Sequence, residues 1–388
     1  MSHKSCFLVG LAAALALACG APSFGARPPK PSYVIRQLDL VDPSGVEYAG
    51  SGVLDVNDPV ETDGPYQAVG AVFTASNQES FPACWTISTV GGQLQSDLKL
   101  LKERPFSSAS PTGINQLGEI VGDETTGADQ EVGVYWADSN EATVPQPLPI
   151  LSNYDRSCAW RINNNGVICG WCSRLVNDAD GQSHSEYRPV LWRVNGGVVV
   201  GGPFELPISE FAFAVAISDN DEGNCAKVVG SSFTEKAVEW TVLDSDGTLT
   251  VSDPKVLNAD GTANAYGVNN DGAVCGTYYK QTTGRLAVVW AGSSMQALNI
   301  ARFFYGPVAY DINNNGVIVG YAQPTKVSTE FAAVWPNATA SMIVLNQFLD
   351  DNSPFLSLRN ARVVNDTGAI VGLGWDGAVS TAYVAVPK

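Results

Sequence analysis

Aromatic and arginine residues gather at three places along the chain where a ligand could be held. Aromatic faces can pack on the apolar face of a sugar or peptide group, and the planar guanidinium group of Arg binds oxygen acceptors. These residue types predict a site for a carbohydrate or protein ligand, although the same rings could instead fill gaps in the packing. The predicted ligand-binding residues are Tyr154, Arg156, Arg302, Phe304, Tyr305 and Arg359.

Two segments rich in Asn and Asp resemble the first half of a calcium loop. DINNNG at 311–316 has oxygen-bearing side chains at alternate positions, as a hard cation requires, but no carboxylate follows at the later ligand positions. A hairpin turn explains this segment better. SDNDEG at 218–223 is denser in acidic residues, so Asp219 and Asp221 are the candidate ligands for a Ca²⁺ ion. We expect no other cofactor.

The cysteines suggest a disulfide better than a metal site. Cys169 and Cys172 form a C-x-x-C, but both lie along a predicted strand, where residues three apart point to opposite faces. A turn closing with Gly166 pairs residues whose numbers sum to about 330. This arithmetic predicts a cross-strand disulfide between Cys158 and Cys172, which a register shift of one residue would remove.

A repeated phrase must position these residues. It is clearest as AYDINNNGVIVGY followed by FAAVW within 309–335, and it recurs as AWRINNNGVICGW and AYGVNNDGAVCGT. Seven copies can be placed, with the turn residues 44 to 58 positions apart. Self-similarity at roughly this period is typical of a stacked or circular array.

Each copy contains four short apolar segments, two of which flank an Asn-Gly turn while a third ends in Trp. β-Branched residues bounded by Asn and Gly indicate strands and hairpins. Four such strands repeated at this period predict a blade of a β-propeller. We therefore expect an all-β, seven-bladed propeller of four-stranded antiparallel blades, forming one domain over 33–388, with the Trp residues packed between blades.

The two ends of the domain predict how the ring closes. The seventh copy stops after its third strand, TAYVAV, and the segment YVIRQLDL at 33–40 can supply the missing fourth strand, so that no sheet edge stays open. This arrangement makes the strand before the Asn turn innermost and places all Asn turns on one face. The more variable connections, of which 172–188 is the longest, lie on the opposite face, where function is expected.

The pattern A-x-x-I-N-x-x-G-x-x-x-G with a following apolar-Trp strand resembles the extracellular HAF-type repeat of bacterial exported proteins. The resemblance covers nearly the whole chain after residue 33. It implies an exported repeat protein and carries no established reaction or catalytic residues.

The first 26 residues have the layout of a secretory signal peptide, with Lys4 before an apolar segment and small residues up to Ala26. An alternative is a lipoprotein acylated at Cys19. The net charge of −17 disfavours nucleic acid as a partner. No second apolar segment has membrane length, and we expect a secreted or envelope-associated monomer.

The sequence thus favours an exported binding or surface-interaction module over an enzyme. With only His3 and His184 available, a catalytic triad or a multi-histidine zinc site has almost no material. The competing hypothesis is an extracellular polysaccharide hydrolase or lyase that uses carboxylates at the channel mouth, for which the nearest candidates are Asp155, Asp178 and Glu210. The third hypothesis is a purely structural component of the cell envelope.

Overall fold

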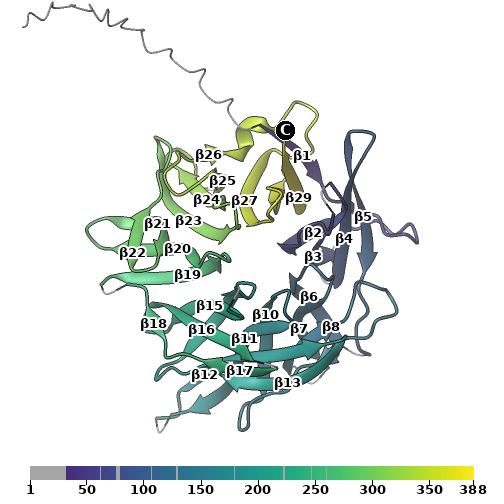
Figure 1. Ribbon diagram of the computed structural model, residues 1–388. Helices are drawn as coiled ribbons and strands as arrows, with labels where there is room; N and C mark the ends of the chain where they lie inside the picture. Colours follow the sequence, from purple (N-terminus) through teal and green to yellow (C-terminus); the bar gives the residue numbers. More distant parts are fainter. Residues whose placement is uncertain are drawn as a thin grey trace, which may run out of the picture.

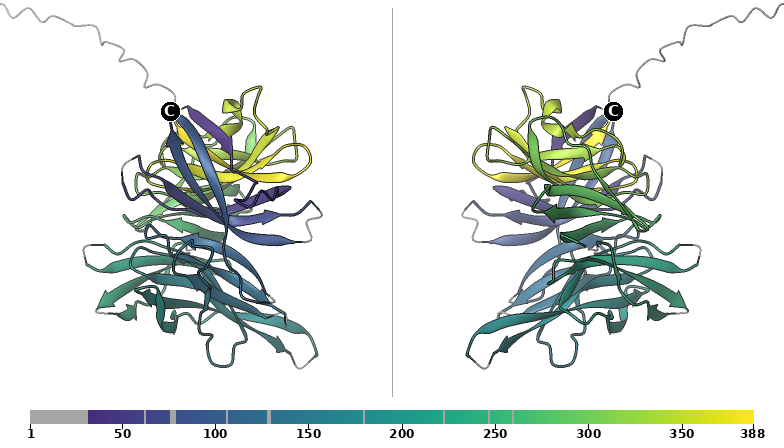
Figure 2. Two further views of the ribbon diagram at one scale, coloured as in Figure 1. Left: turned by 90° about the vertical axis from the view of Figure 1, so that its right-hand side faces the viewer. Right: turned by 90° about the vertical axis from the view of Figure 1, so that its left-hand side faces the viewer.

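Seven antiparallel sheets stand around a common axis (Figure 1). This computed structural model describes residues 32–388 except 62, 76–78, 106, 128–129, 179, 222, 246 and 259, so the predicted signal peptide lies outside the described residues. Six sheets have four strands, and a short extra strand makes the remaining one five-stranded. The predicted seven-bladed β-propeller is confirmed. Figure 2 shows the blades edge-on, with hairpins projecting from both faces of the ring.

The strands follow the chain from the axis outward in each of the first three blades. Blade 1 comprises β2 (Gly50–Val56), β3 (Tyr66–Phe73), β4 (Ser80–Val90) and β5 (Gln93–Leu100). Blade 2 comprises β6 (Ser107–Ile114), β7 (Ile120–Thr126), β8 (Glu131–Trp136) and β9 (Gln146–Pro147). Blade 3 comprises β10 (Arg156–Ile162), β11 (Val167–Asn177), β12 (Ser183–Asn195) and β13 (Val198–Glu205).

The next three blades repeat this order. Blade 4 comprises β14 (Ala212–Ile217), β15 (Cys225–Ser232), β16 (Ala237–Ser245) and β17 (Thr248–Val251), with β18 (Lys255–Val256) also on β16. Blade 5 comprises β19 (Thr262–Val268), β20 (Ala273–Lys280), β21 (Gly284–Ala291) and β22 (Ser294–Ala297). Blade 6 comprises β23 (Phe304–Ile312), β24 (Ile318–Pro324), β25 (Phe331–Trp335) and β26 (Ile343–Val344), followed by the 3₁₀ turn η1 (Leu345–Phe348).

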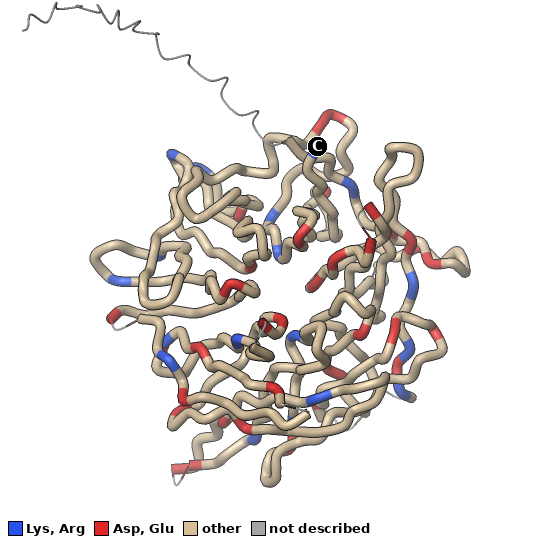
Figure 3. The backbone as a smooth tube through the Cα atoms, viewed as in Figure 1, with Lys and Arg blue, Asp and Glu red and all other residues tan. Residues whose placement is uncertain are grey.

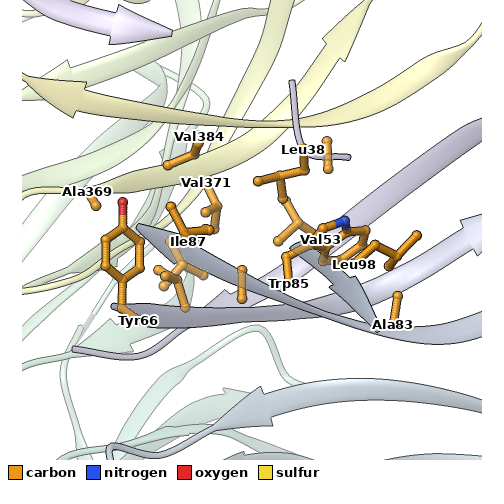
Figure 4. Close-up of a cluster of buried hydrophobic side chains, with 14 of the residues drawn as sticks. Leu38, Val53, Tyr66, Ala83, Trp85, Ile87, Leu98, Ala369, Val371 and Val384 are labelled. Carbon is orange, nitrogen blue, oxygen red and sulfur yellow. The ribbon is translucent and has the colours of Figure 1, made fainter. Parts of the chain in front are cut away.

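Blade 7 is completed by the N-terminal strand, as the sequence predicted. Its chain order is β27 (Ser357–Val364), β28 (Ile370–Trp375) and β29 (Ser380–Pro387), and β1 (Tyr33–Gln37) pairs with β29 from Tyr33↔Pro387 to Gln37↔Tyr383. The strand ends at Gln37, but the chain continues into the interface with blade 1, where Leu38 is completely buried. There it packs in one cluster with residues of blades 1 and 7, among them Trp85 and Val384 (Figure 4).

The Trp residues of the third strands are buried between blades, which confirms their predicted packing role. Each indole N–H except that of Trp290 donates to a backbone carbonyl in the segment that crosses from the preceding blade. In blade 7, Tyr383 takes the Trp position and its hydroxyl donates to the carbonyl of Asn360. The five indole pairs are Trp85 to Asp39, Trp136 to Lys102, Trp192 to Pro149, Trp240 to Pro207 and Trp335 to Asn299, at 2.7–2.9 Å.

The Asn residues that begin the inner turns link neighbouring blades. Each side-chain Nδ2 donates to the backbone carbonyl of the equivalent residue in the next blade, and the last link joins the end of the chain to its beginning. In blade 4, Ser218 replaces Asn and the ring lacks that one amide link among the described residues. The links run from Asn57 to Asn115, Asn115 to Asn163, Asn163 to Ser218, Asn269 to Asn313, Asn313 to Asn365 and Asn365 to Asn57, at 2.8–3.1 Å.

Every inner strand carries a β-bulge three residues before its turn residue. The extra residue interrupts the ladder, and the pairing shifts by one residue beyond it. The seven bulge residues are Leu54, Thr112, Trp160, Val215, Tyr266, Tyr310 and Arg362.

The bulge at Trp160 explains why the predicted disulfide is wrong. Arg161 pairs with Cys169, as the turn arithmetic requires, but beyond the bulge Cys158 pairs with Trp171 and Ser157 with Cys172. The two cysteines therefore lie one step out of register, and both are free thiols. The stretch 172–188 also differs from expectation, because most of it forms the regular hairpin of β11 and β12.

Candidate functional site

Five of the seven bulge residues line a hollow in the central channel. Together with Arg161, the residues Trp160, Val215, Tyr266, Tyr310 and Arg362 enclose about 160 Å³. We call the set Trp160, Tyr266, Tyr310 and Arg362 the aromatic cage. Because a bulge re-aims its side chain, the same irregularity that removed the disulfide turns these residues toward the axis.

The rings of the cage pack on one another at angles that favour aromatic contact. The ring centroids of Tyr266 and Tyr310 are 5.8 Å apart at 67°, and those of Tyr310 and Tyr321 are 5.6 Å apart. The Arg362 guanidinium carbon lies 5.0 Å from the centre of the Tyr310 ring. Burial raises the pKa of the Tyr310 hydroxyl to about 12, so this ring stays neutral.

A second, larger hollow of about 530 Å³, which we call the outer groove, shares walls with the cage. Tyr266 and Tyr310 belong to both hollows. Glu235, in the turn between β15 and β16, also lines the groove, so it opens on the face opposite the Asn turns. The other lining residues are Thr262, Asn264, Thr277, Tyr279, Arg285, Val308 and Tyr321.

Charged side chains bridge blades beneath the cage. Arg161 donates to the backbone carbonyls of Leu54, Thr112 and Trp160, two of which belong to other blades. Its Nε lies 3.6 Å from the Asp55 carboxylate, which also accepts the N–H of Ile114 at 2.9 Å. Figure 3 shows acidic and basic residues of several blades gathered around the axis. Arg161 and Asp55 therefore join neighbouring blades through these bonds.

A third hollow, which is polar, lies at the Asn-turn end of the channel and is lined by the residues of the inner turns. Around it, backbone N–H groups donate to side chains of the next blade, and Asp366 donates its N–H to Asp58 at 2.6 Å. Burial, and then repulsion from Asp366, raise the pKa of Asp58 to about 6. Asp58 is therefore destabilised in its ionised form.

The carboxylates predicted for calcium accept hydrogen bonds from the protein itself. Asp219 accepts from the backbone N–H and side-chain amide of Asn164 at 2.8 and 2.9 Å. Asp221 accepts from the N–H groups of Gly223 and Cys225 in its own turn. Calcium binding at Asp219 and Asp221 stays a prediction.

The titration of Asp58 gives a pH-dependent prediction. In the unfolded chain Asp58 ionises near 3.8, and in the fold only near 6, so its ionisation lowers stability as pH rises between these values. A shift of this size corresponds to at most about 3 kcal/mol, which partial exposure reduces to about 1–2 kcal/mol. The substitution Asp58→Asn should raise the free energy of unfolding by about that amount at pH 7.5 and by nothing near pH 3.5. Denaturant unfolding at the two pH values measures the difference.

Asp376→Asn is the matched control for that prediction. The N–H groups of Val379 and Ala378 lower the pKa of the exposed Asp376, so its neutralisation should destabilise the protein at pH 7.5. A gain for Asp58→Asn that is equal at both pH values would show that repulsion at the ring is not its cause.

The six sequence-predicted ligand residues lie in blades 3, 6 and 7, within the first three residues of the inner strands or just before them. The structure gives four of them partners in their own blades and brings none of the six into the aromatic cage or the outer groove. Arg156 begins β10 and is exposed, and Tyr305 is half exposed. The recorded contacts are Arg174 over Tyr154, Arg302 over Phe303, Arg359 over Trp375, and Phe304 with Phe331.

The cage residues were missed although the sequence carried a signal for them. In the phrase A-x-x-I-N, the first variable position is Trp160, Tyr266, Tyr310 or Arg362 in four of the copies. The residue at this position can vary because the bulge releases it from the ladder. Variation inside the repeat, as well as between copies, would have pointed to the channel.

Two further clusters lie outside the channel. Asp123, Glu131 and Cys158 offer ligand atoms within 4.8 Å of one another between blades 2 and 3, a donor set that could hold a metal ion. Burial raises the pKa of Asp123 to about 6. A second aromatic surface, the blade 3–4 patch, consists of Trp171, Tyr187, Phe211, Phe213 and Phe233.

No protein-family model matches the chain, and no curated protein matches it. Among solved structures, it is similar to the β-propeller domain of the Trilobed protease from Pyrococcus furiosus, with 9% identity, a TM-score of 0.49 and coverage of 88% of this chain and 96% of that one. It is also similar to the six-bladed Aleuria aurantia lectin, described with a fucose recognition mode (12%, 0.40, 78% and 98%), and to Trypanosoma rangeli sialidase (8%, 0.45, 92% and 59%). The fold assignment rests on the seven sheets of this chain.

In the part of the chain that the structure describes, no helix has the length and apolar character needed to cross a membrane.

Proposed function

We propose that this protein is a carbohydrate-binding module whose ligand enters the channel through the outer groove. The observation that carries the proposal is the lining of the groove, where four tyrosines from blades 5 and 6 surround short polar side chains. The C–H face of a sugar ring packs on aromatic faces, while its hydroxyl groups need nearby donors and acceptors. Thr262, Asn264 and Arg285 supply such groups.

The size and exposure of the groove suit a ligand. Its volume of about 530 Å³ lies within the range of about 300–1,000 Å³ that is usual for ligand sites. Tyr279 is 46% exposed, so its ring is available at the mouth, whereas Tyr310 lies deeper and joins the cage. A sugar could therefore contact an outer and an inner ring in succession.

The lining favours binding over hydrolysis. A glycosidase commonly needs two carboxyl groups that flank the scissile bond, and Glu235 is the one carboxylate among the described residues that line the groove. Asp155, Asp178 and Glu210 line neither the groove nor the cage. Together with the resemblance to the HAF-type repeat, the signal-like residues 1–26 support a site of action outside the cytoplasm.

A glycan array with a parallel assay of reducing-sugar release tests this function. We expect retention of one or more glycans without release of reducing ends. Tyr279→Ala should weaken binding about tenfold, because it removes one exposed stacking face worth about 1.4 kcal/mol.

Phe204→Ala is the matched control, since it removes a partly exposed ring on β13, the outermost strand of blade 3, which lines neither the groove nor the cage. Equal loss in both variants would place the ligand elsewhere. Release of reducing sugar that is lost when Glu235 is replaced would contradict the binding-module proposal and support the hydrolase hypothesis.

A further inference from the structure

One arginine of the cage lacks a partner for its charge. Arg362 occupies the bulge of β27 and is only partly buried, yet among the described residues its guanidinium group makes no hydrogen bond or ion pair. Its one recorded contact is with the face of the Tyr310 ring, at 5.0 Å. An unpaired charge inside a protein is costly, and structures usually satisfy such groups.

The neighbours of Arg362 do not neutralise it. Arg161 has the same charge and, after burial, is the second cause that lowers the pKa of Arg362. The carboxylate that acts on it, Asp55, already accepts the N–H groups of Val56 and Ile114 and lies 3.6 Å from Arg161. The remaining walls of the hollow are Trp160, Val215, Tyr266 and Tyr310, which are uncharged.

The cage therefore combines a free cation with flat aromatic walls in a protein whose net charge is −17. A general attraction for anions is excluded by that net charge, so a negative ligand group would be recognised locally. A guanidinium group binds a planar carboxylate through two parallel N–H···O bonds, and the rings accept the apolar face beside it.

We propose that the ligand is an acidic glycan and that Arg362 binds the carboxylate of a uronic acid residue seated in the aromatic cage. This inference rests on the proposed carbohydrate-binding function and names its ligand class. A uronic acid carries both required features, a pyranose face for Tyr266 and Tyr310 and a carboxylate for Arg362. The neighbouring sugars of the chain then lie in the outer groove, which shares these two tyrosines with the cage.

Calorimetric titration of the full protein with a galacturonic acid oligosaccharide, its methyl ester and a neutral galactose oligosaccharide tests the proposal. We expect the acid to bind at least tenfold more tightly than the other two. Arg362→Gln should abolish this preference by lowering the affinity for the acid to that for the neutral oligosaccharide. Arg36→Gln, an exposed arginine on β1, should alter nothing.

The outcomes separate the two proposals. A sulfated oligosaccharide and a peptide with a free C-terminal carboxylate are titrated in the same way. A preference for the acid that survives Arg362→Gln would overturn the inference about the uronic acid. Tighter binding of either of these two probes than of the galacturonic acid oligosaccharide would overturn it as well. Equal binding of all three sugars that Tyr279→Ala weakens would also overturn it while supporting the groove. Absence of binding to any glycan would overturn both. The melting temperature of Arg362→Gln should not fall, so a loss of preference cannot come from unfolding.

Discussion

Removal of residues 33–40 should leave a chain that no longer unfolds cooperatively and that self-associates. The deletion strips β29 of its partner along five paired positions and exposes an apolar sheet edge. It also removes Leu38, which is completely buried between blades 7 and 1, and the Asp39 carbonyl that accepts the Trp85 indole N–H at 2.8 Å. Thermal unfolding followed by circular dichroism, with size-exclusion chromatography, measures both effects.

A point substitution tests the same closure without risk of total misfolding. Leu38→Ala should cost about 2–5 kcal/mol of unfolding free energy, because it leaves a cavity at the interface of two blades. Arg36→Ala on the same segment is exposed and should stay within about 0.5 kcal/mol of the parent protein. If Leu38→Ala were as mild as Arg36→Ala, the N-terminal segment would not hold the ring closed.

Asn365→Ala should produce the second large loss, about 2–4 kcal/mol. The Asn365 amide donates to the carbonyl of Asn57 at 3.0 Å and accepts the N–H of Ala369 at 2.9 Å, and the side chain is buried. Its removal leaves buried polar groups without partners, each of which costs about 1–3 kcal/mol. Urea unfolding monitored by tryptophan fluorescence gives the free-energy difference.

Two comparisons isolate the inter-blade link from the turn. Asn365→Asp keeps the oxygen that accepts from Ala369 but replaces the donor to Asn57, so it should be nearly as harmful at neutral pH. Asn337→Ala removes an exposed Asn that only caps its own turn through Thr339 and should cost no more than about 1 kcal/mol. A harmless Asn365→Asp would mean that the turn, not the link to blade 1, accounts for the loss.

The sequence predicted the frame of the molecule well because the frame is repeated. Seven copies of the phrase reveal which positions recur, and the recurring Asn and Trp reflect two kinds of hydrogen bond between neighbouring blades, of which the described residues make six through Asn and five through Trp. The strand missing from the seventh copy was visible for the same reason. Closure by Tyr33–Gln37 then follows from the need to pair the edge of β29.

The site was predicted less well because it depends on the bulges. Counting residues from the turn assumes an unbroken ladder, so it placed Cys158 opposite Cys172 when Trp171 is the true partner. The same assumption hid the cage, since an unbulged strand would not turn Tyr310 and Arg362 away from the ladder toward the axis. The sequence search for ligand residues went to the irregular connections between blades, where Tyr154 and Arg302 pack against neighbours of their own blades.

The bulges make the lining of the channel independent of the hydrogen bonds that assemble the ring. The same bulge position holds Leu54, Val215, Trp160 and Arg362 in four blades, residues that range from small and apolar to large and charged, and each of these blades keeps its turn. A bulge residue can therefore change while the hydrogen bonds that assemble the ring stay as they are. The propeller is thus a constant scaffold in which the seven bulge residues can be substituted. A propeller with the same blades could bind a different ligand after a few substitutions at these positions.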